Sequence, residues 1–180
     1  CWNFEKYLNQ AQNNWEKVLG KIYIHADTET QKVFYTALYH CYIQPNVFND
    51  VDKRYRGRDD KIHVLSSGKY YTVFSLWDTY RAWHPLMTIL EPKASNDFIN
   101  TFLLQYKQVK LLPIWELASN ETNCMIGYHA VSVIYDAWQK GIHQFNGYQA
   151  LEAMKTMATR NIPSLINYEQ HGCVLASDDG

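Results

Sequence analysis

The sequence predicts a mainly α-helical fold, a helical bundle or an α/α toroid, with a short β-hairpin in a long loop. About six segments carry apolar residues at helical spacing. Short and long connections alternate between them, as they do between successive helical hairpins. Neither a βαβ alternation nor a Gly-rich phosphate loop is present. Because 180 residues suffice for one core, we expect one domain.

The first two helices are predicted from apolar spacing and from their end signals. The first spans residues 2–19 and stops at Gly20, a residue that favours helix ends. The second spans about residues 28–43, where Thr28 and Gln31 have the spacing of a capping box.

A connection of 28 residues follows, at positions 44–71, and shows no helical period. Loops of this length in compact domains are usually functional. Residues 61–65 (KIHVL) and 69–74 (KYYTVF) are predicted to pair as short strands around Ser66-Ser67-Gly68.

The next two helices follow that connection directly. Ser75 and Asp78 have the spacing of a helix start within residues 75–90, and Pro85 predicts a kink or break. A further helix is predicted over residues 95–109.

Residues 111–118 (LLPIWELA) are predicted to be extended, and a helix is expected from Asn120 to Lys140. Asn146 and Gln149 form another capping box, which opens a helix over residues 148–159. The tail from residue 162 is expected to be irregular.

The composition excludes several classes of function. Lys and Arg (17) nearly balance Asp and Glu (18), so no net field attracts nucleic acid or an anionic membrane. No apolar run approaches the roughly 18 residues of a membrane span. Zinc spacings, a GxSxG motif and a P-loop are absent. Aromatic residues reach 15%, with 14 Tyr and 6 Trp, which favours a protein interface or a carbohydrate site.

Trp77, Asp78, Arg81 and His84 form the first candidate constellation, because 77, 81 and 84 share one helical face. In a purely structural interpretation, Asp78 belongs to the helix start and pairs with Arg81. In a functional one, Trp77 offers a ring face to a sugar, and the two oxygens of Asp78 accept hydrogen bonds from a vicinal diol.

Glu116, Asn120 and Glu121 form the second constellation. Asn120 as an N-cap and Glu121 in the first helical turn need no function. Glu116 lies between Trp115 and Leu117, so its carboxylate must be paired or titrate at a raised pH. A role in a site and a structural role are both open.

The charged stretch FNDVDKRYRGRDDK, at residues 48–61, is usually the mark of a solvated loop. Tyr55 lies between Arg54 and Arg56 and is followed by Gly57. This arrangement could also be a rim that holds a ligand loop in place.

Three stretches carry a family resemblance: DVDKRYRG, YYTVFSLWDTYRAWHPL and WELASNETNCMIGYHA. They resemble glycoside hydrolase family 92, the exo-acting, calcium-dependent α-mannosidases, over residues from about Phe4 to the end. The resemblance implies that residues 1–180 are a partial domain, the N-terminal half of an (α/α)6 catalytic barrel. The β-sandwich domain and the C-terminal half of the barrel would be absent.

The resemblance also implies hydrolysis of terminal α-linked mannose with inversion, in bacterial N-glycan degradation. Trp77 and Asp78 are then the best candidates for contacts to the terminal mannose. Glu116, Asn120 and Glu121 would line or buttress the same cavity. Arg81 and His84 are weaker candidates for binding the substrate.

One departure from the family pattern stands in this region. The family usually has Gly where this chain has Ser119, and Ser tolerates a positive φ poorly. The loop geometry near Asn120 is therefore open.

No catalytic residue is assigned, because the acid and base motifs of the family do not occur in this chain. The isolated fragment is therefore expected to be inactive. The Ca²⁺ of the full enzyme is expected to find most of its ligands outside the fragment. The expected partners are mannose-containing glycans, and either the rest of the enzyme or self-association to cover the open face of the toroid. The family habit predicts a periplasmic, cell-surface or secreted protein. The alternative is a non-catalytic carbohydrate-binding or helical scaffold module.

Overall fold

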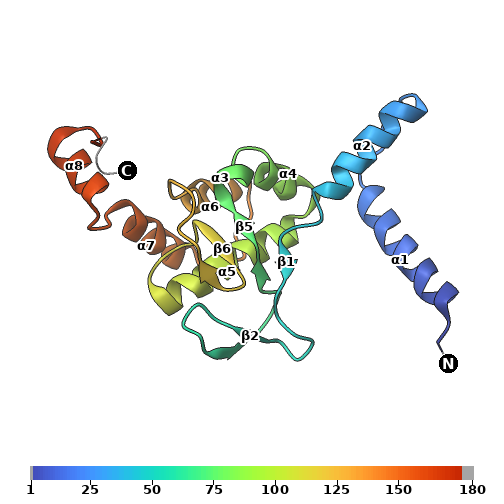
Figure 1. Cartoon of the computed structure of the whole chain (residues 1–180), viewed down its shortest axis with the longest axis horizontal. Helices are drawn as coiled ribbons and strands as arrows, with labels where there is room; N and C mark the ends of the chain where they lie inside the picture. The colour runs from blue at the N-terminus through green and yellow to red at the C-terminus, as the bar shows by residue number, and fades with distance from the viewer. Residues whose placement is uncertain (1, 176–180) are drawn as a thin grey trace. The chain divides into compact units, whose positions relative to one another are not determined.

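The structure, a computed structural model, describes residues 2–175. These residues divide into two compact units, and the boundary in the sequence lies between Pro45 and Asn46. Eight helices and seven short strands occur within these residues, so the mainly α-helical prediction is confirmed. The first unit holds α1 (Phe4–Leu19) and α2 (Thr28–His40), drawn in blue in Figure 1.

The two helices of the first unit begin at different kinds of cap. Asn3 caps α1 as its Oδ1 accepts from the backbone N of Lys6 at 3.2 Å. The predicted capping box at Thr28 is wrong, because Asp27 is the N-cap of α2. Its Oδ1 accepts from the backbone N of Glu29 and of Thr30, both at 3.0 Å. One carboxylate thus satisfies two free amides of the first turn.

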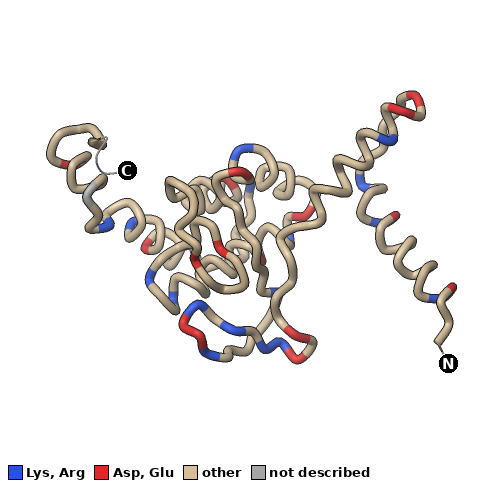
Figure 2. Tube along the Cα trace, viewed as in Figure 1, with Lys and Arg blue, Asp and Glu red and all other residues tan. Residues whose placement is uncertain are grey.

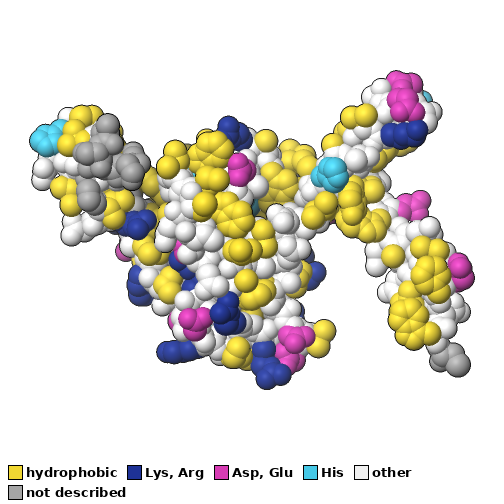
Figure 3. Space-filling model, in the orientation of Figure 1, with side chains coloured by type: hydrophobic (Ala, Val, Ile, Leu, Met, Phe, Trp, Pro, Cys, Tyr) yellow, Lys and Arg dark blue, Asp and Glu magenta, His cyan; other side chains and the backbone are white. Residues whose placement is uncertain are grey.

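The first unit buries little of its apolar surface. No residue of α1 is buried, and Trp15 of α1 meets Tyr39 of α2 with ring centroids 4.6 Å apart. Phe4 and Tyr7 are exposed. Figure 3 shows hydrophobic side chains along the surfaces of both helices.

The second unit contains all the strands and the remaining helices. The strands are β1 (Asn46–Val47), β2 (Arg54–Arg56), β3 (Ile62–Val64), β4 (Tyr71–Thr72), β5 (Phe74–Ser75), β6 (Trp115–Leu117) and β7 (Asn120–Glu121). The helices are α3 (Leu76–Thr79), α4 (Trp83–Leu90), α5 (Pro92–Val109), α6 (Ala130–Gln139), α7 (Gly147–Ala158) and α8 (Pro163–His171).

Helix α5 is the centre of this unit and packs against α4, α6 and α7 (Figure 1). Its buried side chains include Phe98 and Phe102, whose rings meet Phe74 of β5 edge-on at centroid distances of 5.9 and 4.8 Å. Edge-to-face aromatic packing of this kind adds to the stabilisation from area burial. The apolar face predicted for residues 95–109 is therefore the core face of α5.

The predicted hairpin around Ser66-Ser67-Gly68 is wrong. Strand β3 pairs with β2, and β4 pairs with β1, both antiparallel. The flanks of the predicted hairpin bond to earlier parts of the loop instead. The backbone N of Leu65 donates to Lys53 O at 3.0 Å, and that of Phe48 to Tyr70 O at 2.8 Å.

The break predicted within residues 75–90 lies earlier than expected. Helix α3 ends at Thr79, and α4 begins after Ala82, whose φ of −140° and ψ of −48° are not helical. Pro85 lies in the first turn of α4, where its missing N–H is not needed.

The helix predicted from Asn120 to Lys140 is wrong over its first half. Asn120 and Glu121 form β7, and α6 begins only at Ala130. The backbone N and Oγ1 of Thr122 donate to Trp115 O at 3.1 and 2.9 Å, which extends the hairpin instead.

The last two helices give one confirmation and one correction. Asn146 Oδ1 accepts from the backbone N of Gln149 at 2.9 Å, so the predicted cap of α7 is confirmed. The irregular tail is wrong, because α8 spans Pro163–His171 and ends at Gly172 in the left-handed region. Proline at the start of a helix and glycine after its end are typical boundary signals.

Charged residues gather in the connection around β2 and β3 (Figure 2). Arg56 Nη1 pairs with Asp60 Oδ1 at 3.1 Å, and His63 Nε2 with Asp59 Oδ1 at 2.8 Å. None of the helices between residues 4 and 171 is both long and apolar enough to cross a membrane.

Candidate functional site

The three-stranded sheet β5–β6–β7 brings the two predicted constellations together. Phe74 and Ser75 of β5 pair with Glu116 and Trp115 of β6. Glu116 and Leu117 then pair with Glu121 and Asn120 of β7. Since β5 leads directly into α3, the segment with Trp77 and Asp78 is anchored to the hairpin that carries the second constellation.

The two faces of this sheet have different characters, because residues directly opposite in antiparallel strands share a face. Phe74, Glu116 and Glu121 share the inner face. Phe74 and Glu116 are buried there, and the Glu121 side chain is 9% exposed. The outer face carries Ser75, Trp115, Leu117 and Asn120, which are half-buried or exposed.

Glu116 is fully buried, and its carboxylate is held by internal donors. Thr72 Oγ1 donates to Oε1 and Oε2 at 2.9 and 3.1 Å, and the backbone N of Val73 donates to Oε2 at 3.1 Å. The backbone N of Ser119 donates to Oε1. Burial raises the pKa of Glu116 to about 7, and these hydrogen bonds and Arg58 oppose the shift. Of the two roles expected for Glu116, the geometry is that of a buttress.

Glu121 is a second internal acceptor and not a residue of a helical first turn. Its Oε2 and Oε1 accept from the backbone N of Ile114 and of Trp115, both at 2.8 Å. Arg58 Nη2 lies 3.9 Å from Oε2, and both side chains are nearly buried. Burial lowers the pKa of Arg58, while the charges of Glu121 and Glu116 raise it.

Three non-glycine residues in the left-handed region lie next to Glu116. Their φ angles are +70° at Val73, +49° at Ala118 and +63° at Ser119. Each such residue costs about 1 to 2 kcal/mol, and a β-branched residue such as Val73 is a clear outlier there. Such strain persists only where the surroundings enforce it, and it concentrates at functional sites.

Residues 118 and 119 are the two-residue loop of the β6–β7 hairpin. A positive φ at both central positions is typical of the type I′ turn, in which Asn-Gly is the usual pair. Ser119 tolerates its positive φ here with a buried Oγ that donates to Arg56 O at 2.7 Å and lies 3.2 Å from the Tyr70 hydroxyl. The loop before Asn120 therefore keeps a positive φ at residue 119, although Ser stands where the family usually has Gly.

Asp78 is exposed on the short helix α3, and Ser75 Oγ donates to its Oδ2. The expected Asp78–Arg81 pair does not form among the described residues. Arg81 Nη2 instead donates to Trp77 O at 3.3 Å, and the guanidinium lies 4.8 Å from the centroid of the Trp77 ring. Trp77 is half-buried.

His84 lies apart from these residues, in the core. It is 3% exposed and lies among the rings of Phe74, Trp83 and Phe102. Its Nε2 has no hydrogen-bond partner among the described residues. Burial lowers the pKa of His84 to about 3, so the imidazole is neutral at physiological pH.

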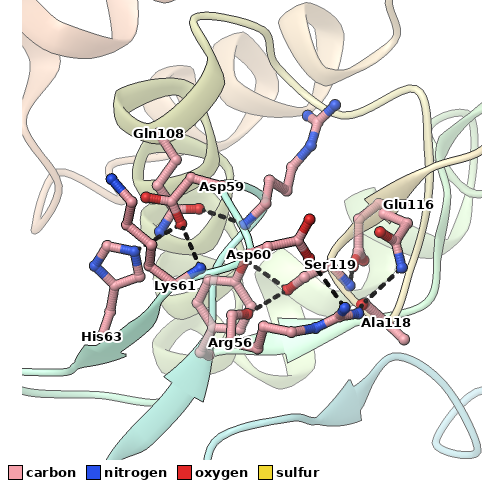
Figure 4. Close-up of polar contacts among 12 residues, drawn as sticks. Arg56, Asp59, Asp60, Lys61, His63, Gln108, Glu116, Ala118 and Ser119 are labelled. Atoms are coloured by element: carbon pink, nitrogen blue, oxygen red, sulfur yellow. Dashed lines mark hydrogen bonds and ion pairs between the residues drawn. The ribbon is translucent and has the colours of Figure 1, made fainter.

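The charged loop contributes Arg56, which the sequence indicated only as part of a possible rim. Arg56 Nη2 donates to Ala118 O, at the tip of the hairpin (Figure 4). Tyr55 is buried, and its ring stacks on Tyr70 with centroids 4.0 Å apart. The interpretation of this stretch as a support for another loop therefore agrees with the contacts of Arg56.

Sequence reasoning missed Thr72 and Trp115 in this region. The alternation in Trp115-Glu116-Leu117 was the available signal for Trp115, because one acid between two apolar residues in a strand faces the other way. No local signal pointed to Thr72, whose partner Ala118 is 46 residues away.

Within residues 2–175, no three His, Cys, Asp or Glu side chains lie close enough together to hold a metal ion. The calcium expected from the family resemblance stays a prediction for the full enzyme.

The family described as the glycosyl hydrolase family 92 catalytic domain matches residues 1–178. The solved structures with similar folds include a family GH92 alpha-mannosidase from Bacteroides thetaiotaomicron, at 42% identity and a TM-score of 0.89. The match covers 93% of this chain and 23% of that protein.

Two further solved structures are similar. One is the same alpha-mannosidase in complex with mannoimidazole, at 43% identity and a TM-score of 0.89, covering 92% of this chain and 22% of that one. The other is a family GH92 inverting mannosidase from Bacteroides thetaiotaomicron, at 31% identity and a TM-score of 0.83. That match covers 93% of this chain and 24% of the mannosidase. No curated protein matches the chain.

Proposed function

The chain belongs to glycosyl hydrolase family 92, and we propose that it is the substrate-binding part of an inverting exo-α-mannosidase acting on terminal α-linked mannose of glycans. The chain spans 23% of the first similar mannosidase, so the proposed activity is that of a longer protein. The observation that carries the proposal is the exposed carboxylate of Asp78 beside Trp77, in a chain 42% identical to that mannosidase.

Asp78 is suited to bind two neighbouring hydroxyl groups of a hexose. Its two oxygens can accept two hydrogen bonds, which matches a vicinal diol. Ser75 donates to Oδ2 only and thereby orients the side chain. Arg81 covers part of the Trp77 ring, and the remaining ring surface is apolar and suits the C–H groups of a sugar.

Asn120 is the third residue of the proposed sugar-binding surface. It lies on the outer face of the sheet and is exposed, with Nδ2 3.3 Å from Ala118 O. Its side-chain amide can donate to and accept from sugar hydroxyls. Glu116 and Glu121 act from the inner face as supports, and His84 belongs to the core.

We assign no catalytic acid or base within this chain. Inversion needs a proton donor and a carboxylate that activates water on the opposite side of the sugar ring. The carboxylates of Glu116 and Glu121 are already occupied by internal donors. The pair is proposed to lie in the parts of the longer protein that the chain does not span. A calcium requirement and export from the cytoplasm stay predictions for that protein, and no calcium ligand is assigned here.

The test is the replacement of Asp78 in the complete protein. Asp78→Ala should lower kcat/KM for an α-mannoside at least about 100-fold, which corresponds to about 3 kcal/mol. Glu152→Ala is the matched control, since Glu152 is an exposed acid on α7 that pairs with Lys155, and it should leave the kinetics unchanged.

Unchanged kinetics in Asp78→Ala would remove Asp78 from the site. A complete protein that binds mannose but does not hydrolyse α-mannosides would favour the alternative, a non-catalytic carbohydrate-binding module.

A further inference from the structure

The carboxylate of Glu116 lies where two separate segments of the chain take up left-handed conformations. Val73 directly precedes β5, and β5 leads to Trp77 and Asp78. Ala118 and Ser119 directly precede Asn120. The segments that carry the residues proposed to contact the sugar are therefore preceded by three residues with a positive φ, and all three lie next to Glu116.

Each of these three positions depends on Glu116 through its backbone N–H. Val73 N donates to Oε2 at 3.1 Å, and Ser119 N donates to Oε1. Ala118 N donates to Thr72 Oγ1 at 2.6 Å, and that hydroxyl donates to both carboxylate oxygens. The Thr72 hydroxyl thus links the carboxylate of Glu116 to the backbone N of Ala118, and we call this link the relay.

A second set of contacts holds the same turn from the charged loop. In Figure 4, Arg56 reaches the turn near Glu116, with its side chain directed at Ala118 and Ser119 beside it. Arg56 Nη2 donates to Ala118 O, and Ser119 Oγ donates to Arg56 O at 2.7 Å. Both sides of the turn are therefore hydrogen-bonded, which is the surrounding that sustained backbone strain requires.

We propose that Glu116 is a positioning residue that holds Val73, Ala118 and Ser119 in left-handed conformations and so places Trp77, Asp78 and Asn120 for sugar binding. We call Glu116, Thr72 and Arg56 the clamp. The placement for a sugar rests on the proposed function, whereas the conformational role of the clamp does not.

Glu116→Gln is the direct perturbation, because the amide keeps the shape and loses one acceptor. Whichever way the amide turns, either Val73 N or Ser119 N loses its acceptor. We expect hydrogen exchange of one of these two amides in the complete protein to become about 10- to 100-fold faster. Mass spectrometry with backbone fragmentation over residues 72–75 and 117–121 reads this out. Exchange within about twofold of the wild type at both amides would overturn the proposal.

Rescue separates positioning from a general loss of stability. Ala118→Gly removes the Cβ from a left-handed position, so it should restore part of what Glu116→Gln loses. Lys110→Gly is the matched control, because Lys110 has a φ of +59° but lies at the end of α5, outside the clamp.

The readout of the rescue is the affinity for mannoimidazole, measured by calorimetry. Glu116→Gln should weaken it about tenfold or more, Ala118→Gly should recover at least half of that loss on a logarithmic scale, and Lys110→Gly should recover none. Equal recovery by both glycine variants, or by neither, would overturn positioning.

Two further outcomes are distinguishable. If Glu116→Gln does not fold, Thr72→Val tests the clamp, since it keeps the acid and removes only the relay. It should accelerate exchange at Ala118 more than at Val73, and equal rates in wild type and variant would overturn the relay. If the wild type does not bind mannoimidazole, the proposed function fails, while the exchange experiment still tests the clamp.

Discussion

Glu116→Gln should change how the stability of the protein depends on pH. Burial raises the pKa of Glu116 from 4.5 to about 7, so the folded state holds this proton more tightly than the unfolded state does. Between these two pH values the folded state binds more protons, and its stability therefore falls as the pH rises. The contribution is fully present below 4.5 and is lost as the pH rises through about 7.

The size of the effect follows from the shift. A pKa unit corresponds to about 1.4 kcal/mol, so the rise from 4.5 to about 7 corresponds to about 3 kcal/mol. Glutamine does not titrate, so the stability of the variant lacks the pH dependence that Glu116 contributes. The variant is therefore the reference for the wild type. Other titrating groups are the same in both proteins and cancel in the difference.

The assay is urea unfolding of wild type and Glu116→Gln at several pH values from about 4 to about 8. The difference in unfolding free energy, wild type minus variant, should decrease by about 3 kcal/mol over this range. Equal m-values are needed, so that the midpoint reports stability. A difference that stays flat or increases with pH would refute the raised pKa and the reasoning from burial.

Three other substitutions test further parts of the structure. His84→Phe should remove an acid-sensitive contribution to the unfolding free energy. Burial lowers the pKa of His84 from 6.5 to about 3, so this contribution is present above pH 6.5 and is lost as the pH falls towards 3. Equal acid sensitivity of unfolding in wild type and variant would contradict the buried neutral imidazole. Asn146→Ala should cost about 1 kcal/mol of unfolding free energy through loss of the α7 cap, while Asn146→Asp should be nearly neutral; a loss in both variants would point away from the cap. Ser119→Ala should destabilise by about 1 to 3 kcal/mol, because Arg56 O loses its donor, and Ser119→Gly should lose about 1 kcal/mol less because it also removes the strain of the positive φ.

The elements that the sequence predicted well are those whose signals are local. Helix α5 follows the apolar spacing of Phe98 and Phe102, and α7 begins at the Asn146 cap. In these segments the residues that decide the structure lie within one or two turns of each other. Pattern and structure therefore agree.

The elements that the sequence predicted poorly depend on partners outside their own segment. Asn120 and Glu121 look like a helix start, but Glu121 instead accepts from the backbone of Ile114 and Trp115. The strands around Ser66-Ser67-Gly68 have their partners in residues 46–56. Strand pairing is decided by packing and by which backbone groups remain free, and a local pattern contains neither.

The candidate site also has a part that local signals predict and a part that depends on strand pairing. Trp77 and Asp78 lie on one short helix, and the sequence places them together. The roles of the two acids depend on the face of a three-stranded sheet, which becomes visible only after β5, β6 and β7 are paired. Glu116 then lies inside and Asn120 outside, although the sequence treats them alike.

The position of Ser119 connects the long charged loop to the proposed sugar-binding surface. A glycine at this position would adopt the left-handed conformation unaided. Serine needs an interaction that offsets the cost of its positive φ. Its Oγ donates a hydrogen bond to Arg56 O, 63 residues earlier in the chain. Because Arg56 also donates to Ala118 O, the loop around β2 and the turn before Asn120 are bonded as one structure. A substitution in the loop around β2 should therefore change the conformation of the turn, and the reverse. The position of Asn120 then depends on that loop, even if the loop does not touch the sugar.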